Sequence, residues 1–462
     1  MFVARTKKDL RAWATEQLEM TGAEARASLS DAEFDKETGE ITYHGYLAIS
    51  AKPVFEFPDN LKSITDGLYL ENCENLSRLP EGLSIEDSLS IIDCDQLVSL
   101  PIELKVAGSL ELEGCAALEN YYCEDPGRLH QLTRSGRDIH LQYWQRLKCL
   151  PTGFATEGNL TLLDLPSLTD LPEGLSVAGW LMMISRCPQL RYLAENTSIA
   201  GWMSLAHCPG LQTLPASLRV GGRLMIEDCQ GLEESYTRDP ARLKELADVA
   251  NGLSLSGWEK LWELPDGLSV TGGLSLQNCT NLFSLPIGLK AGHLDLNGCP
   301  HLERYYSARP ERLLNLRSMA HGFSLSGWKQ LKRIPDGLSK VDSLDLSDCT
   351  NLESLPEHLE VKGSLDLHNC KALRGLPPHL KVGKRLTLSS CPNLVEIGEG
   401  LDVGTLQVRD CPKLVSLPDD IRVEDTLTVQ QHLETEARRL HRAGKVGAVV
   451  VGGSGSFSRA DN

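Results

Sequence analysis

The sequence has few aromatic residues, a deficit of positive charge and no long apolar run. Aromatic side chains make up 5% of its 462 residues, so a core built from it must be mainly aliphatic. No stretch approaches the roughly 18 consecutive apolar residues of a membrane-spanning helix, so we expect no insertion into a membrane. The formal net charge of −17 argues against a nucleic-acid-binding protein, because phosphate recognition needs a basic surface.

Several short signals are also missing. The first twenty residues contain no apolar segment and therefore predict no conventional secretory signal. No C-x-x-C pair occurs, so we assign no metal site. The VGGSGS stretch near the end lacks the Lys-Ser/Thr of a phosphate-binding loop, and we expect no cofactor. Fourteen cysteines are present, which in a small secreted protein would suggest disulfides.

The spacing of the cysteines indicates a repeat instead. Twelve of them fall into groups with steps of 20 or 21 residues: Cys73, Cys94, Cys115, Cys187, Cys208, Cys229, Cys279, Cys299, Cys349, Cys370, Cys391 and Cys411. The same frame fills the gaps between groups, with Trp144, Leu165, Trp258 or Trp328 in the cysteine position. Sixteen frames of the form L-x-L-x-x-(N/C)-x-x-L result, a pattern typical of leucine-rich repeats.

The frame predicts an α/β solenoid. L-x-L is a short strand with its leucines pointing inward, and the cysteine position suits a small buried side chain. The L-P-x-x-L limb is extended, because proline forces its predecessor towards β geometry. Each repeat buries its leucines only against its neighbours. We therefore expect a leucine-rich-repeat superhelix with a parallel sheet on the concave face and extended convex limbs, and with reduced, buried cysteines in the frame.

Three repeats have a longer spacing, and we expect helical insertions near residues 125–135, 239–250 and 310–320. A solenoid also needs its ends covered. Residues 1–44 are predicted to form a helical N-terminal cap, with Leu10, Trp13 and Leu18 as apolar anchors. The solenoid is assigned to residues 45–432. Residues 433–462 are predicted to form a C-terminal capping helix and a mobile tail, because glycine and serine are frequent there.

With its LPEGL, LPDGL and LPIGL limbs, the chain resembles the bacterial leucine-rich-repeat proteins that have L-P-x-x-L limbs. Their best-known members are type III secreted effectors, including ubiquitin ligases of the invasion-plasmid-antigen class. The resemblance covers roughly residues 45–432, and cysteine stands where those effectors usually carry asparagine. It implies a location in the bacterial cytoplasm, or secretion into a host cell without a conventional signal peptide.

Those ligases use a nucleophilic cysteine in a C-x-D motif, which only Cys123-Glu124-Asp125 matches here. The two sister insertions carry Thr237 and Ser307 at the position of Cys123, and no activating base is indicated. We assign no catalytic residue and expect no enzymatic activity. The alternative is a ubiquitin-ligase-type effector that uses a cysteine thiol, or the substrate-binding part of one.

Function in a solenoid is expected on side chains that point outward between the strand leucines. In four successive middle repeats, Leu163, Met183, Trp202 and Met225 should form one exposed apolar strip with glutamates at its borders, as in many protein-binding sites. We predict a non-enzymatic scaffold that binds a partner protein with a basic surface through Glu111, Glu113, His140, Leu163, Met183, Trp202, Met225 and Glu227. The alternative is a one-residue slip in strand register, which would bury Met183.

Overall fold

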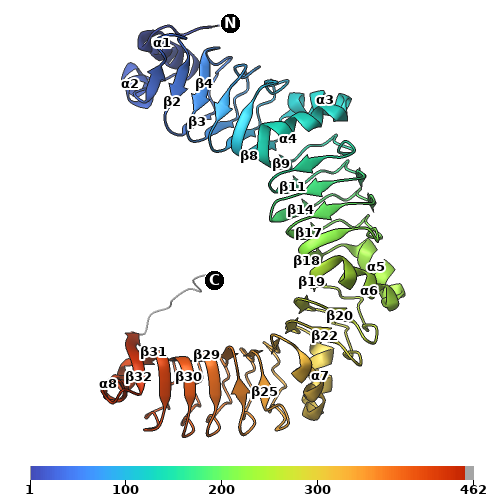
Figure 1. The fold of residues 1–462 in the computed structure, drawn as a ribbon, viewed down its shortest axis with the longest axis vertical. Coiled ribbons are helices and arrows are strands. Elements are labelled where there is room, and N and C mark those ends of the chain that lie inside the picture. The colour runs from blue at the N-terminus through green and yellow to red at the C-terminus, as the bar shows by residue number, and fades with distance from the viewer. Residues whose placement is uncertain (1, 453–462) are drawn as a thin grey trace. The chain divides into compact units, whose positions relative to one another are not determined.

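A computed structural model describes residues 2–452 of the chain. The chain divides into two compact units, Met1–Ser235 (unit 1) and Tyr236–Asn462 (unit 2). Within each unit, short strands from successive repeats lie side by side in parallel (Figure 1). This arrangement confirms the predicted solenoid-like repeat fold.

In unit 1, a parallel ladder is formed by the L-x-L strands of the successive repeats. Its members are β3 (Leu47–Ser50), β5 (Leu68–Glu71), β7 (Leu89–Ile92), β8 (Lys105–Glu113), β9 (Gly136–Gln142), β11 (Leu160–Leu163), β14 (Leu181–Ser185), β17 (Trp202–Ala206) and β18 (Arg219–Glu227). Shorter strands pair just before them: β4 (Leu61–Ile64), β6 (Ser84–Ile85), β10 (Ala155–Thr156), β13 (Ser176–Val177) and β16 (Ser198–Ile199). Two limb segments, β12 (Asp170–Leu171) and β15 (Tyr192–Leu193), also pair in parallel.

Unit 2 repeats this plan. Its L-x-L strands are β19 (Ala250–Ser254), β21 (Leu274–Ser275), β23 (Leu294–Asp295), β24 (Phe323–Ser324), β26 (Leu344–Asp345), β28 (Leu365–Asp366), β29 (Lys381–Ser389), β30 (Asp402–Arg409) and β31 (Arg422–Gln430). The shorter strands are β20 (Ser269–Val270), β22 (Lys290–Ala291), β25 (Lys340–Val341) and β27 (Glu360–Val361).

The strand register agrees with the frame. In β14, Met182 and Ile184 are fully buried, whereas Met183 between them points out of the core. In β17, Met203 and Leu205 are buried in the same way. The slip that would have buried Met183 does not occur, because it would expose two large apolar side chains on each strand.

The cysteine position joins each repeat to the one before it. All twelve frame cysteines are free and buried, as the frame predicted. Eleven of their thiols donate to a strand carbonyl of the preceding repeat, and the Cys208 thiol donates to the Ala206 carbonyl of its own repeat. The Cys370 Sγ donates to the Leu346 carbonyl at 3.2 Å, and the Cys391 Sγ donates to the Leu367 carbonyl at 3.1 Å. The indole N–H of Trp328 makes the same kind of bond to the Leu296 carbonyl at 3.0 Å. In most of the cysteine repeats and at Trp328 the position therefore combines burial with hydrogen bonding to the neighbouring repeat, whereas Leu165 fills it by burial alone.

The three insertions begin earlier than predicted, immediately after the cysteine position. The first two consist of three short helical segments each, α3 (Ala116–Glu124), η1 (Pro126–Gln131) and α4 (Leu132–Ser135), and α5 (Gln230–Arg238), η2 (Pro240–Arg242) and α6 (Leu243–Val249). The third consists of two, α7 (Pro300–Ser307) and η3 (Pro310–Ser318). The Asp-Pro and Arg-Pro pairs mark only the start of the second segment. A buried tyrosine of the first segment packs near the next tryptophan of the frame, as Tyr122 does with Trp144 at 6.1 Å between ring centroids. The longer repeat is thus filled by an aromatic pair.

The two ends differ from the sequence prediction in part. The N-terminal cap contains the expected helices, α1 (Lys7–Gln17) and α2 (Gly22–Ser28), and its apolar anchors Leu10, Trp13 and Leu18 are buried. It also contains an antiparallel hairpin of β1 (Ala32–Phe34) and β2 (Ile41–Tyr43). Strand β2 pairs in parallel with β4 and so joins the cap to the solenoid sheet. The purely helical prediction missed this hairpin.

At the other end, η4 (Gln431–Leu433) and α8 (Glu434–Arg442) form the expected capping helix. The stretch predicted to be a mobile tail then forms a strand, β32 (Val446–Gly452), which pairs with β31. Its valines favour β structure, and β31 offers an edge with which they can pair. Together these outweigh the tendency of the surrounding glycines to disfavour a strand. The rest of that predicted tail, residues 453–462, lies outside the described residues.

The burial pattern makes a prediction about thiol reactivity. Only Cys123 and Cys149 are partly exposed, and burial, followed by the Glu119 carboxylate, raises the pKa of Cys123 to about 11. Burial also raises the pKa of Cys149. Iodoacetamide at pH 8 should therefore modify at most these two thiols in the native protein, and all fourteen after unfolding.

The thiolate is the reacting form, so the rate at Cys123 should keep rising as the pH passes through 9 and 10. Peptide mapping by mass spectrometry measures both quantities. Rapid modification of a frame cysteine such as Cys370 in the native protein would contradict the assignment.

Candidate functional site

The structure places all eight predicted site residues on the exposed face of neighbouring strands in unit 1. One row of paired residues crosses the sheet from Glu111 through His140, Thr161, Met183 and Ser204 to Met225. A parallel row runs from Glu113 through Gln142, Leu163, Ser185 and Ala206 to Glu227. Because neighbouring strands lie about 4.8 Å apart, these side chains form one continuous surface.

Leu163, Met183, Trp202 and Met225 form an apolar strip on this face. The first three lie on the successive strands β11, β14 and β17. Met183 stands two residues before Ser185, the register partner of Leu163, and Trp202 stands two residues before Ser204, the register partner of Met183. The strip therefore runs diagonally across the sheet. Trp202 is 54% exposed, and its indole lies against the backbone of Gly222 on β18. A Cβ atom at Gly222 would come within 2.0 Å of the Trp202 ring, so the glycine leaves room for the indole. The strip is therefore supported by the sheet and open to solvent.

Carboxylates crowd one border of the strip. Partial burial raises the pKa of Glu113, and the carboxylates of Glu111, Asp93 and Glu71 raise it further. Glu111 accepts hydrogen bonds from neutral donors, the Ser90 hydroxyl at 2.8 Å and the Gln142 amide at 3.1 Å. Within residues 2–452, no lysine or arginine forms an ion pair with Glu71, Glu111 or Glu113. A cation brought by a partner would relieve this repulsion.

The equivalent face of unit 2 is small and polar. Its serines and aspartates hydrogen-bond to one another, as in Ser256 to Ser275 at 3.1 Å and Ser324 to Asp345 at 2.9 Å. Ser347 donates to Ser326 at 2.9 Å in the same way. The two units therefore share one frame. Unit 1 presents several large apolar side chains on its strand face, whereas the L-x-L strands of unit 2 carry polar side chains there and, over the residues that the structure describes, Val450 of the edge strand β32 is exposed beside them.

A second feature of unit 1 lies at the carboxyl ends of the strands. In all sixteen repeats, the residue before the cysteine position has a positive φ, between 50° and 78°. Thirteen of these residues are Gly, Asn, Asp or Ser, which suit this left-handed turn or tolerate it. The other three are Tyr143, Arg186 and His207, with φ values of 58°, 55° and 53°. Tyrosine and arginine are unusual at such angles and histidine less so, as His358 and His379 also show, and the conformation costs on the order of 1–3 kcal/mol for a residue other than glycine.

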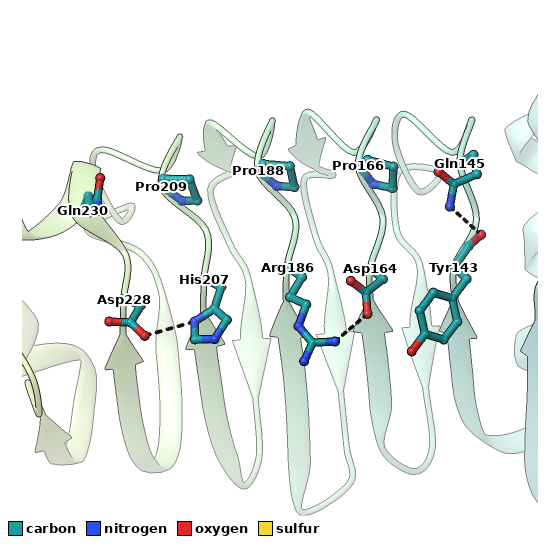
Figure 2. Close-up of a pocket in the computed structure, with 10 residues that line it drawn as sticks. All are labelled: Tyr143, Gln145, Asp164, Pro166, Arg186, Pro188, His207, Pro209, Asp228 and Gln230. Atoms are coloured by element: carbon teal, nitrogen blue, oxygen red, sulfur yellow. Dashed lines mark hydrogen bonds and ion pairs between the residues drawn. The ribbon is translucent and has the colours of Figure 1, made fainter.

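These three residues line one groove. Together with Asp164 and Asp228 they form the left-handed row: Tyr143, Asp164, Arg186, His207 and Asp228. The opposite wall consists of the residues after the cysteine position, Gln145, Pro166, Pro188, Pro209 and Gln230. Figure 2 shows the two rows running side by side where the strands end. The open groove that they line has a volume of about 610 Å³. The Arg186 guanidinium lies 2.9 Å from the Asp164 carboxylate, and the His207 ring lies 3.3 Å from the Asp228 carboxylate.

The sequence prediction missed this groove and one exposed tryptophan. It considered only the residues four and two places before the cysteine position, plus a strand-edge position that gave Trp202 and Arg223. Aligning the repeats at the preceding residue would have singled out Tyr143, Arg186 and His207 among glycines, asparagines and aspartates. The same alignment would have singled out Trp180, which stands seven places before the cysteine position, where half of the repeats carry glycine. Trp180 is 84% exposed, and its carbonyl accepts the Trp202 amide N–H.

The remaining sequence candidates lie apart from this surface. Cys123 lies on helix α3, and Cys149 lies on an extended limb. Among residues 2–452, no group of three or more His, Cys, Asp or Glu side chains is arranged to hold a metal ion. No helix in that range combines the length and the apolar character needed to cross a membrane.

Comparisons with known proteins add little to this description. No protein-family model matches the chain, and no curated protein matches it. Among solved structures, the chain is similar to the plant peptide hormone receptor RGFR1 in complex with RGF2, with 13% identity over 91% of this chain and 99% of that chain. The TM-score is 0.15, so this likeness carries no argument. The fold rests on the repeat and on the parallel sheets of the two units.

The left-handed row leads to a stability prediction. Arg186→Asn should raise the free energy of unfolding by up to about 1 kcal/mol, because asparagine adopts positive φ more readily and the exposed ion pair with Asp164 contributes little. The reverse change in the same frame position, Asn72→Arg, should lower it by a similar amount. Urea denaturation at constant ionic strength measures both. A clear loss of stability in Arg186→Asn would contradict the argument.

Proposed function

We propose that the protein is a non-enzymatic recognition scaffold that binds a partner protein with the exposed strand face of unit 1. The observation that carries this proposal is the apolar strip centred on Trp202. Buried aromatic and aliphatic anchors contribute most of the affinity in protein interfaces. A folded protein seldom exposes such side chains together without a binding role. The polar face of unit 2 supports the assignment, because the same frame accepts serine and aspartate at these positions.

The proposed partner presents a basic surface. The chain carries a net charge of −17, and the border of the strip gathers Glu111, Glu113 and Glu227. An acidic field accelerates the encounter with a basic protein, and the charged border helps to set its orientation. His140 pairs in register with Glu111 and lies inside this border.

The properties of Cys123 favour a scaffold over an enzyme of the ubiquitin-ligase class. A nucleophilic cysteine needs a lowered pKa or an adjacent base. Burial and the nearby Glu119 carboxylate act in the opposite direction here and raise the pKa of Cys123 to about 11. Cys149 is shifted in the same direction. Binding without covalent chemistry is therefore the simpler function for this surface.

The resemblance to L-P-x-x-L effectors supports a role for the scaffold either inside a bacterium or, after export, in a host cell. The binding face would serve either location. A basic host protein is the partner that the effector form of the proposal requires.

The prediction that tests the proposal is a pair of tryptophan substitutions. A photoreactive amino acid in place of Ser204, beside the strip, first cross-links the partner to the full chain so that it can be identified and purified. Trp202→Ala should then weaken binding of that partner by about 2 kcal/mol or more, roughly 30-fold, because a central aromatic anchor is lost. Isothermal titration calorimetry measures the dissociation constant.

Trp262→Ala is the matched control. Trp262 is 53% exposed, almost the same as Trp202, but lies on a limb outside the strand face. It should bind the partner like the wild type. Both variants should unfold at the wild-type temperature. Unchanged affinity in Trp202→Ala would sink the proposal.

A further inference from the structure

The groove beside the left-handed row is a separate surface from the apolar strip. We propose that it binds an extended peptide segment of a partner whose side chains on one face read basic, acidic, basic. The proposal rests on four features of the groove: the order of the side chains in the left-handed row, the spacing of these side chains, the apolar wall opposite the row, and the left-handed backbone conformation of the row.

Four members of the left-handed row place an aspartate at each end, with Arg186 and His207 between them. Along four successive repeats the left-handed row reads Asp164, Arg186, His207 and Asp228 (Figure 2). Arg186 uses Nη1 to reach Asp164, and its side chain remains 56% exposed, so further N–H groups of the guanidinium point to solvent. The His207 side chain is 49% exposed beside Asp228. A carboxylate between Arg186 and His207, with a cation beside each aspartate, would complete the pattern.

The spacing fits an extended chain. Four adjacent repeats separate Asp164 from Asp228 by about 14 Å at roughly 4.8 Å per repeat. In an extended peptide, residues i, i+2 and i+4 lie on one face and span about 13 Å. A Lys-x-Glu-x-Lys segment therefore places its lysines near the two aspartates and its glutamate near the midpoint, between Arg186 and His207.

The opposite wall suits an extended backbone. Pro166, Pro188 and Pro209 follow the cysteine position in three successive repeats, so this wall presents apolar rings and no backbone N–H groups at those positions. Tyr143 lies at one end of the left-handed row, where the next repeat towards the N-terminus carries Gly114. The channel is thus an apolar trough with charges along one side.

The backbone supplies the remaining argument. Tyr143, Arg186 and His207 occupy a position that other repeats fill with glycine, asparagine or aspartate, and their left-handed conformation costs stability. All three lie in the same stretch of five repeats, and all three line the channel. A ligand contact explains why these side chains stand at unfavourable backbone angles in this stretch.

Three fluorescein-labelled peptides test the inference by fluorescence polarisation against the full chain at low ionic strength, where exposed charges are little screened. They are capped, share threonine at all other positions to favour extended backbone, and carry Lys-x-Glu-x-Lys, Lys-x-Gln-x-Lys or Glu-x-Lys-x-Glu. General attraction to an acidic protein would favour the glutamine peptide, which is the most positive. Recognition of the pattern favours the first peptide.

We expect the Lys-x-Glu-x-Lys peptide to bind wild type at least tenfold more tightly than the glutamine peptide. Arg186→Asn should abolish this preference while the protein stays folded. Arg191→Asn, which removes an equal charge from an exposed limb of the same repeat, should keep it. Equal or tighter binding of the glutamine peptide, or a preference that survives Arg186→Asn, would overturn the inference.

The peptide measurement is independent of the proposed function. Trp202 does not line the groove, so Trp202→Ala should bind the three peptides as the wild type does. If Trp202→Ala leaves partner binding unchanged while the wild type still discriminates between the peptides, the proposal for the apolar strip is wrong and the proposal for the groove stands. If Trp202→Ala weakens partner binding but the wild type does not discriminate between the peptides, only the proposal for the groove is wrong.

Discussion

The stacking of repeats depends on what each cysteine position can do for the repeat before it. A side chain there must be buried, must fit between layers about 4.8 Å apart, and lies against a strand carbonyl. A thiol meets these conditions with little volume, as in the 3.0 Å contact of Cys299 with the Leu276 carbonyl. Tryptophan takes over after each insertion, where a buried tyrosine such as Tyr306 packs 6.1 Å from Trp328. This constraint fixes the layer spacing and therefore the strand face above it.

Once the layers are fixed, the outward side chains can vary without affecting the core. In unit 2 the strand face carries serine and aspartate side chains that hydrogen-bond to one another, as on a sheet that faces water. Unit 1 places Leu163, Met183, Trp202 and Met225 on the equivalent face and bulky residues at left-handed turns beside it. Since one frame builds both units, the difference between them reflects surface requirements and not folding requirements.

The strength of the frame explains which features the sequence could predict. A leucine at every second strand position defined the register, so Met183 and Trp202 were correctly placed on the exposed face. The burial of the frame cysteines followed from the same spacing. The predicted ranges coincide with the later segments of the insertions, which begin at Pro126, Pro240 and Pro310. The first segments were missed because their start signals are weak: α3 has no side-chain cap, and only Pro300 marks the start of α7. Strand β32 was missed because an edge strand depends on its neighbour β31, which local composition does not reveal.

The groove required a different comparison. Its residues Tyr143, Arg186 and His207 are unremarkable as single letters, and only their coincidence with a left-handed turn makes them unusual. That conformation becomes visible when all sixteen repeats are superposed, because thirteen of them carry residues suited to it or tolerant of it. Trp180 lies seven places before the cysteine position, where half of the repeats carry glycine, so the same alignment would have singled it out as well.

The central claim is that unit 1 gives up stability at specific exposed positions to bind a partner. The most direct measurement is made on a full-length chain in which these positions are returned to the residues that unit 2 uses: Tyr143→Asn, Arg186→Asn, His207→Asn, Met183→Ser and Trp202→Ser. Chemical unfolding and binding of the cross-linked partner are measured on the same preparation. The account predicts a free energy of unfolding equal to or above that of the wild type, together with loss of partner binding. A destabilised protein, or one that still binds its partner, would contradict it.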